Sequence, residues 1–328
     1  MRKKFLITGI TGFAGPNLAK LLIKEGHEVH GVIRCPNGRQ TDLMDILTLD
    51  EYNQITFHSL DLKQTNSVFK LFEKNKFDGV FHLAAQSHPP TSFSDPILTF
   101  DENVTASMNI ITALEKTGTK LMFCSTSEVY GDTCKDRGIL KVTDALTPHN
   151  PYAASKAAID LYLQERFKNG FIDGFITRAF SHTGARRGFN FSISSDAFQI
   201  AKMVLGLQEK KLKIGNLKTK RVVIDVRDCV NAYYLLMMEP KSSGKVFNIC
   251  GKEVHEMQYF TDKLIECSGI PYNDIIQEID PKLYRPIDIQ VQIGDSSEVE
   301  ELVNWVPKYT IDETMKSLLD YWLNKLKK

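Results

Sequence analysis

Short apolar runs alternate with longer amphipathic segments along the first half of the chain. Five of the runs have the length and apolar content of buried strands, and they cover residues 4–8, 28–33, 55–58, 79–85 and 120–125. Helical patterns lie between them, notably at 16–25 and 95–115. This alternation predicts right-handed crossovers and an α/β fold with a doubly wound parallel sheet, whose ligands bind outside the carboxyl ends of the strands.

The first strand leads into a glycine-rich turn, TGITGFAG, from Thr8 to Gly15. Pro16 follows, and proline suits the first turn of a helix. Glycine permits the tight turn and leaves room for a dinucleotide pyrophosphate, whose charge the free N–H groups of the helix N-terminus stabilise. The spacing is G-x-x-G-x-x-G, so the position after a first strand carries more weight than the glycines alone. Together these features predict a Rossmann-like cofactor cradle.

The regular alternation ends near residue 173, which suggests how the 328 residues are divided. We expect residues 1–173 to form an NAD(P)-binding Rossmann domain, its sheet completed by part of 174–250. The segment 171–177 is expected to return to that sheet. Residues 174–328 are expected to form mainly a smaller C-terminal substrate-binding domain.

Charge and cysteine content exclude several classes of function. Lysine plus arginine (41) nearly balances aspartate plus glutamate (40), which argues against a nucleic-acid or membrane surface driven by net charge. The six cysteines (35, 124, 134, 229, 250 and 267) lack C-x-x-C or zinc-type spacing and are expected to be free thiols. No metal site and no membrane span are expected. The prediction is a cytoplasmic protein.

The predicted dinucleotide contacts follow the strand ends. They are Gly9, Thr11, Gly12, Phe13, Ala14, Gly15, Arg34, Asp61, Leu62, Leu83, Ala84 and Ala85, together with Tyr152 and Lys156. An acidic residue after the second strand would hold the ribose hydroxyls of NAD, whereas an arginine accommodates the 2′-phosphate of NADP. Arg34 stands there, so the local sequence leans slightly to NADP, and NAD stays open.

Polar chemistry gathers after the fifth strand. Thr126 and Glu128 follow it directly, and Tyr152 and Lys156 open a helix behind Pro151. Tyr and Lys four residues apart share one helical face, and a lysine ammonium near the phenol favours its deprotonation. The tyrosine would then exchange a proton with a substrate hydroxyl, a proton that Thr126 could share.

Four motifs together resemble the extended short-chain dehydrogenase/reductase family that modifies nucleotide-linked sugars. They are TGITGFAG, HLAAQSH (82–88), STSEVYG (125–131) and NPYAASK (150–156). The resemblance implies that NAD(P) takes a hydride from the sugar, usually at C4. It also implies that Tyr152 is the acid/base, that Lys156 holds the ribose and the phenol, and that Thr126 contacts the sugar 4-oxygen.

The second half resembles the GDP-sugar branch, the GDP-mannose 4,6-dehydratases and GDP-4-keto-6-deoxy-mannose reductases, through RAFSHTGARRG (178–188), IGNLKTKRVVIDVRD (214–228) and YRPIDIQVQIGD (284–295). The implied substrate contacts are Ser87, His88, Thr126, Ser127, Ser181, Arg186, Arg187, Asn216, Arg221 and Arg285. Members of this branch usually carry asparagine where Ser181 stands. The arginines would donate bidentate hydrogen bonds to oxygens of the diphosphate.

Glu128 leaves the reaction open between two classes. As a base at C5 it would permit a 4,6-dehydration; in a binding role it would leave a C4 dehydrogenase or reductase. The C4 dehydrogenase or reductase, in surface-polysaccharide sugar biosynthesis, is the leading hypothesis. A 4,6-dehydratase is the alternative, and a 4-epimerase or a non-catalytic nucleotide sensor is a lesser one. A homodimer or higher homo-oligomer is expected, with pairing through the helices at 96–115 and 152–169.

Overall fold

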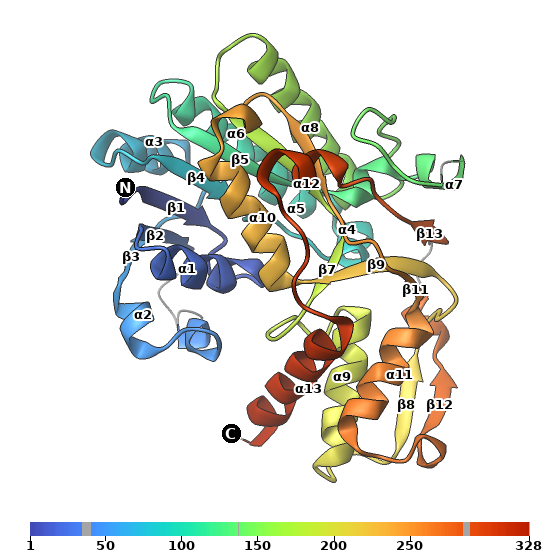
Figure 1. Cartoon of the computed structure of the whole chain (residues 1–328). Coiled ribbons are helices and arrows are strands. Elements are labelled where there is room, and N and C mark those ends of the chain that lie inside the picture. The colour runs from blue at the N-terminus through green and yellow to red at the C-terminus, as the bar shows by residue number, and fades with distance from the viewer. Residues whose placement is uncertain (35–40, 137, 285–288, 328) are drawn as a thin grey trace.

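The computed structural model describes residues 1–328 except 35–40, 137, 285–288 and 328 (Figure 1). A seven-stranded sheet with the order β10-β6-β5-β4-β1-β2-β3 forms its centre, and every pairing in it is parallel. The strands are β1 (Lys4–Thr8), β2 (Glu28–Ile33), β3 (Ile55–Ser59), β4 (Gly79–His82), β5 (Lys120–Thr126), β6 (Gly174–Ala179) and β10 (Val246–Ile249). The predicted Rossmann-like α/β fold is confirmed.

Helices cover both faces of this sheet because each strand buries side chains on both sides. Phe5 and Ile7 of β1 pack into one core, and Leu6 between them packs into another. The first core is closed by α1 (Ala14–Lys24), α10 (Val226–Met238) and α12 (Ser297–Val303), and the second by α3 (Thr65–Lys74), α6 (Ala106–Leu114) and α8 (Pro151–Lys168). The strands and helices expected from the apolar pattern therefore form a layered core.

Several element bounds differ by one residue from the sequence-based expectation, and three elements differ by more. Helix α1 begins at Ala14, two residues early, because Phe13 already has helical angles and proline is tolerated in the first turn. Strand β4 ends at His82 rather than at residue 85, since the next residues turn along the glycine loop. The helix expected at 95–115 consists of α5 (Pro96–Phe100), a π-helical turn (Asp101–Thr105) and α6.

The chain after residue 180 contributes to a second part, which lies below the sheet in Figure 1. Its helices are α9 (Ser192–Val204), α11 (Met257–Ser268) and α13 (Ile311–Lys327), which share a third core. Its strands are β7 (Ser181–Thr183), β8 (Lys211–Ile214), β9 (Lys220–Asp225), β11 (Val254–Glu256), β12 (Ile276–Ile279) and β13 (Val291–Gln292). Shorter helices in the chain before residue 180 are α2 (Leu49–Asn53), α4 (Pro89–Ser94) and α7 (Thr133–Asp136).

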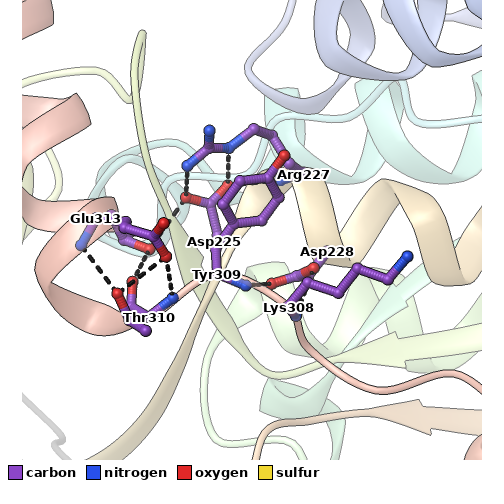
Figure 2. A network of polar contacts seen from close by, with 8 residues as sticks. Asp225, Arg227, Asp228, Lys308, Tyr309, Thr310 and Glu313 are labelled. Carbon is purple, nitrogen blue, oxygen red and sulfur yellow. Dashed lines mark hydrogen bonds and ion pairs between the residues drawn. The ribbon is translucent and has the colours of Figure 1, made fainter.

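Two aspartates at the start of α10 attach the C-terminal helix to the rest (Figure 2). The Asp228 carboxylate accepts hydrogen bonds from the backbone N–H groups of Lys308 (2.9 Å) and Tyr309 (3.0 Å). Asp225 accepts two from the Arg227 guanidinium, at 2.8 and 2.7 Å, and one from Thr314 of α13 at 3.0 Å. Both aspartates of the DVRD motif (225–228) thus hold the chain around the start of α13 in place.

A buried ion pair joins α8 to β6, the strand next to the edge strand β10. Arg178 of β6 is 1% exposed, and its guanidinium donates to both oxygens of Asp160 at 2.9 and 2.8 Å. The same guanidinium donates to the Tyr130 hydroxyl at 3.1 Å, and that hydroxyl donates to Asn248 of β10 at 2.7 Å. Asp160 lies one turn after Lys156, so this network fixes the helix that carries the Tyr/Lys pair.

Within the described residues, no helix is long and apolar enough to cross a membrane. The cysteines at 124, 134, 229, 250 and 267 are free, as expected from their spacing.

We expect Asp160→Asn to lower the free energy of unfolding by about 3 kcal/mol, because it leaves the buried Arg178 charge uncompensated. Urea denaturation measures the change. Glu165→Gln, at the exposed end of the same helix, is the matched control and is expected to leave stability unchanged. Equal losses in the two variants would contradict the importance of the buried pair.

Candidate active site

A cavity of about 1090 Å³ runs along the carboxyl ends of the sheet strands and into the second part. Most of the residues named from the sequence line it. They are Gly9, Thr11, Gly12, Phe13, Ala14, Gly15, Arg34, Asp61, Leu62, Leu83, Ala84, Ala85, Ser87, His88, Thr126, Ser127, Glu128, Tyr152, Lys156, Ser181, Arg187, Asn216 and Arg221. Arg285 lies outside the described residues. Among the described residues, no group of three or more His, Cys, Asp or Glu side chains is arranged to hold a metal.

The glycine turn at one end of the cavity leaves no room for side chains at two positions. Gly9 has φ +72°, and a Cβ there would lie 2.7 Å from the backbone nitrogen of Ala84. A Cβ on Gly15 would lie 2.5 Å from the carbonyl oxygen of Ile10. Helix α1, which follows, has no side-chain cap and no acid in its first turn. Its N–H groups therefore face an anion site of the kind that a dinucleotide pyrophosphate fits.

Arg186, expected among the substrate contacts, does not appear among the described residues that line the cavity. Its guanidinium donates instead to the carbonyl oxygens of Thr11 (3.0 Å), Gly12 and Asp42 (3.1 Å). The expectation is corrected because three backbone carbonyl oxygens, two in the glycine turn and one at Asp42, already bind this guanidinium. Arg186 thus braces the turn.

Arg187, unlike Arg186, lines the cavity. The guanidinium carbon lies 3.5 Å from the ring centroid of Phe191 and 4.7 Å from that of Phe13. Burial lowers the pKa of Arg187 to about 10, so it is still a cation at neutral pH. His182 stacks on Phe13, and burial lowers its pKa to about 4, so it is neutral.

Tyr152 lines this cavity, and burial is the main influence on the pKa of its phenol. Burial raises the pKa of Tyr152, and the Cys124 thiol and the Glu128 carboxylate act in the same direction. A hydrogen bond with Thr126 and the charge of Arg187 oppose them. Thr126 and Arg187 thus favour the phenolate, and a contribution from Lys156 stays a prediction.

Lys156 is held by groups of β5 rather than by the phenol. Its ammonium donates to the carbonyl oxygen of Cys124 at 2.6 Å and lies 4.6 Å from the ring centroid of Phe123. Burial lowers the pKa of Lys156, while the charges of Cys124 and Asp160 raise it. The lysine is thus oriented toward the end of β5, beside the tyrosine.

Glu128 is positioned by Asn150, a residue that the sequence analysis did not select. The Asn150 amide nitrogen donates to the Glu128 carboxylate at 3.1 Å, and its amide oxygen caps α8 by accepting the N–H of Ala153 at 2.7 Å. His149 approaches the same carboxylate at 3.8 Å. A helix-capping asparagine before proline was a visible signal, but only the fold shows that its other end holds Glu128.

Asp196 is a second residue that the sequence did not indicate. It lies on α9, lines the far end of the cavity and accepts a hydrogen bond from Thr261 at 2.8 Å. Burial raises its pKa to about 7. Asp196 lies on the buried side of α9, and only the fold shows that its carboxylate meets Thr261 of α11.

The chain is similar to known proteins over nearly its whole length. Residues 6–318 match the family described as GDP-mannose 4,6 dehydratase. GDP-mannose 4,6 dehydratase 1 of Arabidopsis thaliana is 30% identical over 332 residues, which cover 97% of this chain and 89% of the relative. GDP-6-deoxy-D-mannose reductase of Pseudomonas aeruginosa is 28% identical over 332 residues, which cover 100% and 99%. The solved structure of RMD from P. aeruginosa, complexed with NADPH, superposes with a TM-score of 0.81 at 24% identity, covering 98% and 99%.

We expect Gly15→Ala to weaken dinucleotide binding at least about tenfold and to lower stability, because the new Cβ meets fixed backbone oxygens. Mass spectrometry of the small molecules released on denaturation measures the retained dinucleotide. Gly138→Ala is the control, since nothing lies within 4 Å of a Cβ at that position. Full retention by Gly15→Ala would show that the turn tolerates a side chain.

Asp196→Asn is expected to stabilise the protein at pH 8, by about 1–3 kcal/mol. The folded-state pKa of about 7 lies above the unfolded value, so the wild type loses stability as pH rises from about 4 to about 7, and the variant does not. Denaturant unfolding at pH 5 and pH 8 measures the difference. If the difference in unfolding free energy between the two proteins is as large at pH 5 as at pH 8, ionisation of Asp196 is not its cause.

Proposed function

The chain belongs to the GDP-mannose 4,6-dehydratase family, and we propose that it transfers a hydride at C4 of a GDP-linked, manno-configured sugar with NAD(P). It is an enzyme of the oxidoreductase type. The observation that carries the proposal is the placement of Thr126, Tyr152 and Lys156 in the wall of the cavity that also contains the glycine turn. Proton exchange and dinucleotide binding thus meet in one space.

The residues of the glycine turn fit the cofactor. Positions 9 and 15 admit no Cβ, and the uncapped α1 terminus offers free N–H groups to a diphosphate. When bound, the cofactor accepts a hydride from C4 or donates one to it, and in a dehydration it would return the hydride at C6.

We assign the proton transfers to Tyr152. A neutral phenol, which burial favours, is the form that donates a proton to the 4-oxygen in a reduction, and the phenolate accepts one in an oxidation. Thr126 hydrogen-bonds to this phenol and would contact the 4-oxygen as well. Lys156 would orient the cofactor ribose and the phenol from the end of β5.

A 4,6-dehydratase is the alternative, and the position of Glu128 supports it. A 4-keto group acidifies the C5 proton, and a carboxylate held by Asn150 in the cavity wall is placed to remove it, with the C6 hydroxyl leaving as water after protonation. If Glu128 only binds the sugar, the chemistry stops at C4. The two curated relatives named above include one enzyme of each kind.

The substrate diphosphate is assigned to Arg187 and Arg221, and the nucleoside to the end of the cavity around Asn216. Ser87, His88, Ser127 and Ser181 would contact the sugar. Arg285, outside the described residues, stays an expectation from the motif YRP. In this proposal residues 174–328 supply most of the GDP-sugar site, and residues 1–173 most of the NAD(P) site.

We further propose a cytoplasmic homodimer that supplies sugars for surface polysaccharide. Exposed apolar side chains support the pairing of copies, because α5 and α8 lie side by side and carry several of them. Ile97 is 82% exposed, Leu161 is 55% exposed, and Leu98 and Phe100 lie nearby on α5.

Incubation of the purified enzyme with GDP-mannose and related GDP-sugars tests the reaction. We expect the product mass to change by two hydrogens in step with the cofactor, and Glu128→Gln to leave that change in place. Loss of the mass of water by the wild type, abolished in Glu128→Gln, would replace the leading proposal by the dehydratase.

Tyr152→Phe is expected to lower the rate about 10²–10⁴-fold, since it removes the proton-exchanging hydroxyl. The rate of cofactor reduction or oxidation, followed by absorbance, measures the effect. Tyr272→Phe, at an exposed tyrosine of the second part, is the control and is expected to retain full activity. Full activity in Tyr152→Phe would remove Tyr152 from the mechanism.

A further inference from the structure

We propose that Glu102 is the residue that selects the cofactor and that it sets the enzyme to NAD rather than NADP. The inference rests on the proposed function, because it concerns the adenosine end of the dinucleotide site. It names a residue that no motif identified, on the π-helical turn between α5 and α6.

Glu102 lies where the second ribose of a dinucleotide is expected. In a Rossmann fold the adenosine ribose is bound at the carboxyl end of the second strand. Arg34 directly follows β2, and Lys63 follows Asp61 and Leu62 after β3. All five of these residues, Glu102 included, line the same cavity as the glycine turn.

The two cations at this end of the cavity are paired with carboxylates. Both terminal nitrogens of the Arg34 guanidinium donate to Glu102, one of them at 3.0 Å. The Lys63 ammonium lies 3.4 Å from Glu102 and 2.8 Å from Asp101. The Glu102 side chain is 11% exposed, against 63% for that of Arg34, so the carboxylate is the more enclosed partner.

A 2′-phosphate would have to compete with Glu102 for the same guanidinium fork. An arginine binds a phosphate best through two parallel N–H groups, and in this structure a carboxylate occupies both. A phosphate that displaced Glu102 from Arg34 would leave the carboxylate with Lys63 as its cation partner and would set two negative groups within a few ångströms of each other. The ribose hydroxyls of NAD carry no charge, and a carboxylate accepts hydrogen bonds from them.

The sequence alone leaned the other way because it showed an arginine, and no acid, after the second strand. The acid comes from a segment 68 residues later in the chain. With Glu102 included, the residues at the end of β2 fit the ribose hydroxyls of NAD better than the 2′-phosphate of NADP.

An exchange experiment on the purified holoenzyme tests this inference. The protein is incubated with an equimolar excess of NAD⁺ and NADP⁺, washed and denatured, and the released dinucleotides are quantified by mass spectrometry. We expect the wild type to retain mainly NAD, and Glu102→Gln to raise the ratio of NADP to NAD at least about tenfold, because one negative charge is removed beside the phosphate.

Two further variants make the result specific. Asp101→Asn removes the neighbouring carboxylate, which pairs with Lys63 but is not among the described cavity-lining residues, and should leave the ratio near the wild-type value. Arg34→Gln added to Glu102→Gln should reverse the gain in NADP. A wild type that retains mainly NADP, or a ratio unchanged by Glu102→Gln, overturns the inference and leaves the proposed function standing. Retention of neither dinucleotide overturns both.

Discussion

The buried ion pair between Arg178 and Asp160 is the interaction on which the geometry of the site depends. It joins β6 to α8 one turn beyond Lys156, and through Tyr130 and Asn248 it reaches the edge strand β10. An arginine buried to this extent is stable only with its carboxylate and its hydrogen bonds in place. The direction of α8, and with it the position of Tyr152 against the cavity, follows from that requirement.

The glycine turn is held from two sides. On one side the backbone at Ala84 approaches Gly9 too closely for any side chain. On the other side Arg186 donates to the carbonyl oxygens of the turn. Arg186 has φ +72°, a left-handed conformation that is uncommon for a residue with a side chain, and it allows two consecutive arginines to diverge. One braces the cofactor cradle, and Arg187 enters the cavity.

Burial sets the charges inside the cavity. It raises the pKa of Tyr152 and lowers those of Lys156, Arg187 and His182. Each shift favours the neutral form of its group, since desolvation penalises charge. Thr126 and Arg187 work against this at the phenol, so proton exchange at Tyr152 is governed by a few neighbouring groups rather than by solvent.

The sequence by itself determined the elements that depend on local patterns. Apolar runs gave the strands of the sheet, glycine and proline marked the turn before α1, and the i, i+4 spacing placed Tyr152 and Lys156 on one helical face. These predictions were confirmed because propensity and periodicity act over a few residues. Motifs also named most of the residues that line the cavity.

Only the tertiary structure decided which partner each charged side chain takes. Arg34 pairs with Glu102 across 68 residues, and Arg186 reaches Gly12 across 174. Asn150 holds Glu128, and Cys124 rather than the phenol receives Lys156. The periodicity of the sequence does not predict such contacts, because they form where segments distant in the chain meet near the carboxyl ends of the strands. The net charge at the end of β2 is the sum of all nearby charges. The effect of Arg34 on cofactor choice can therefore be judged only when the fold shows Glu102 beside it.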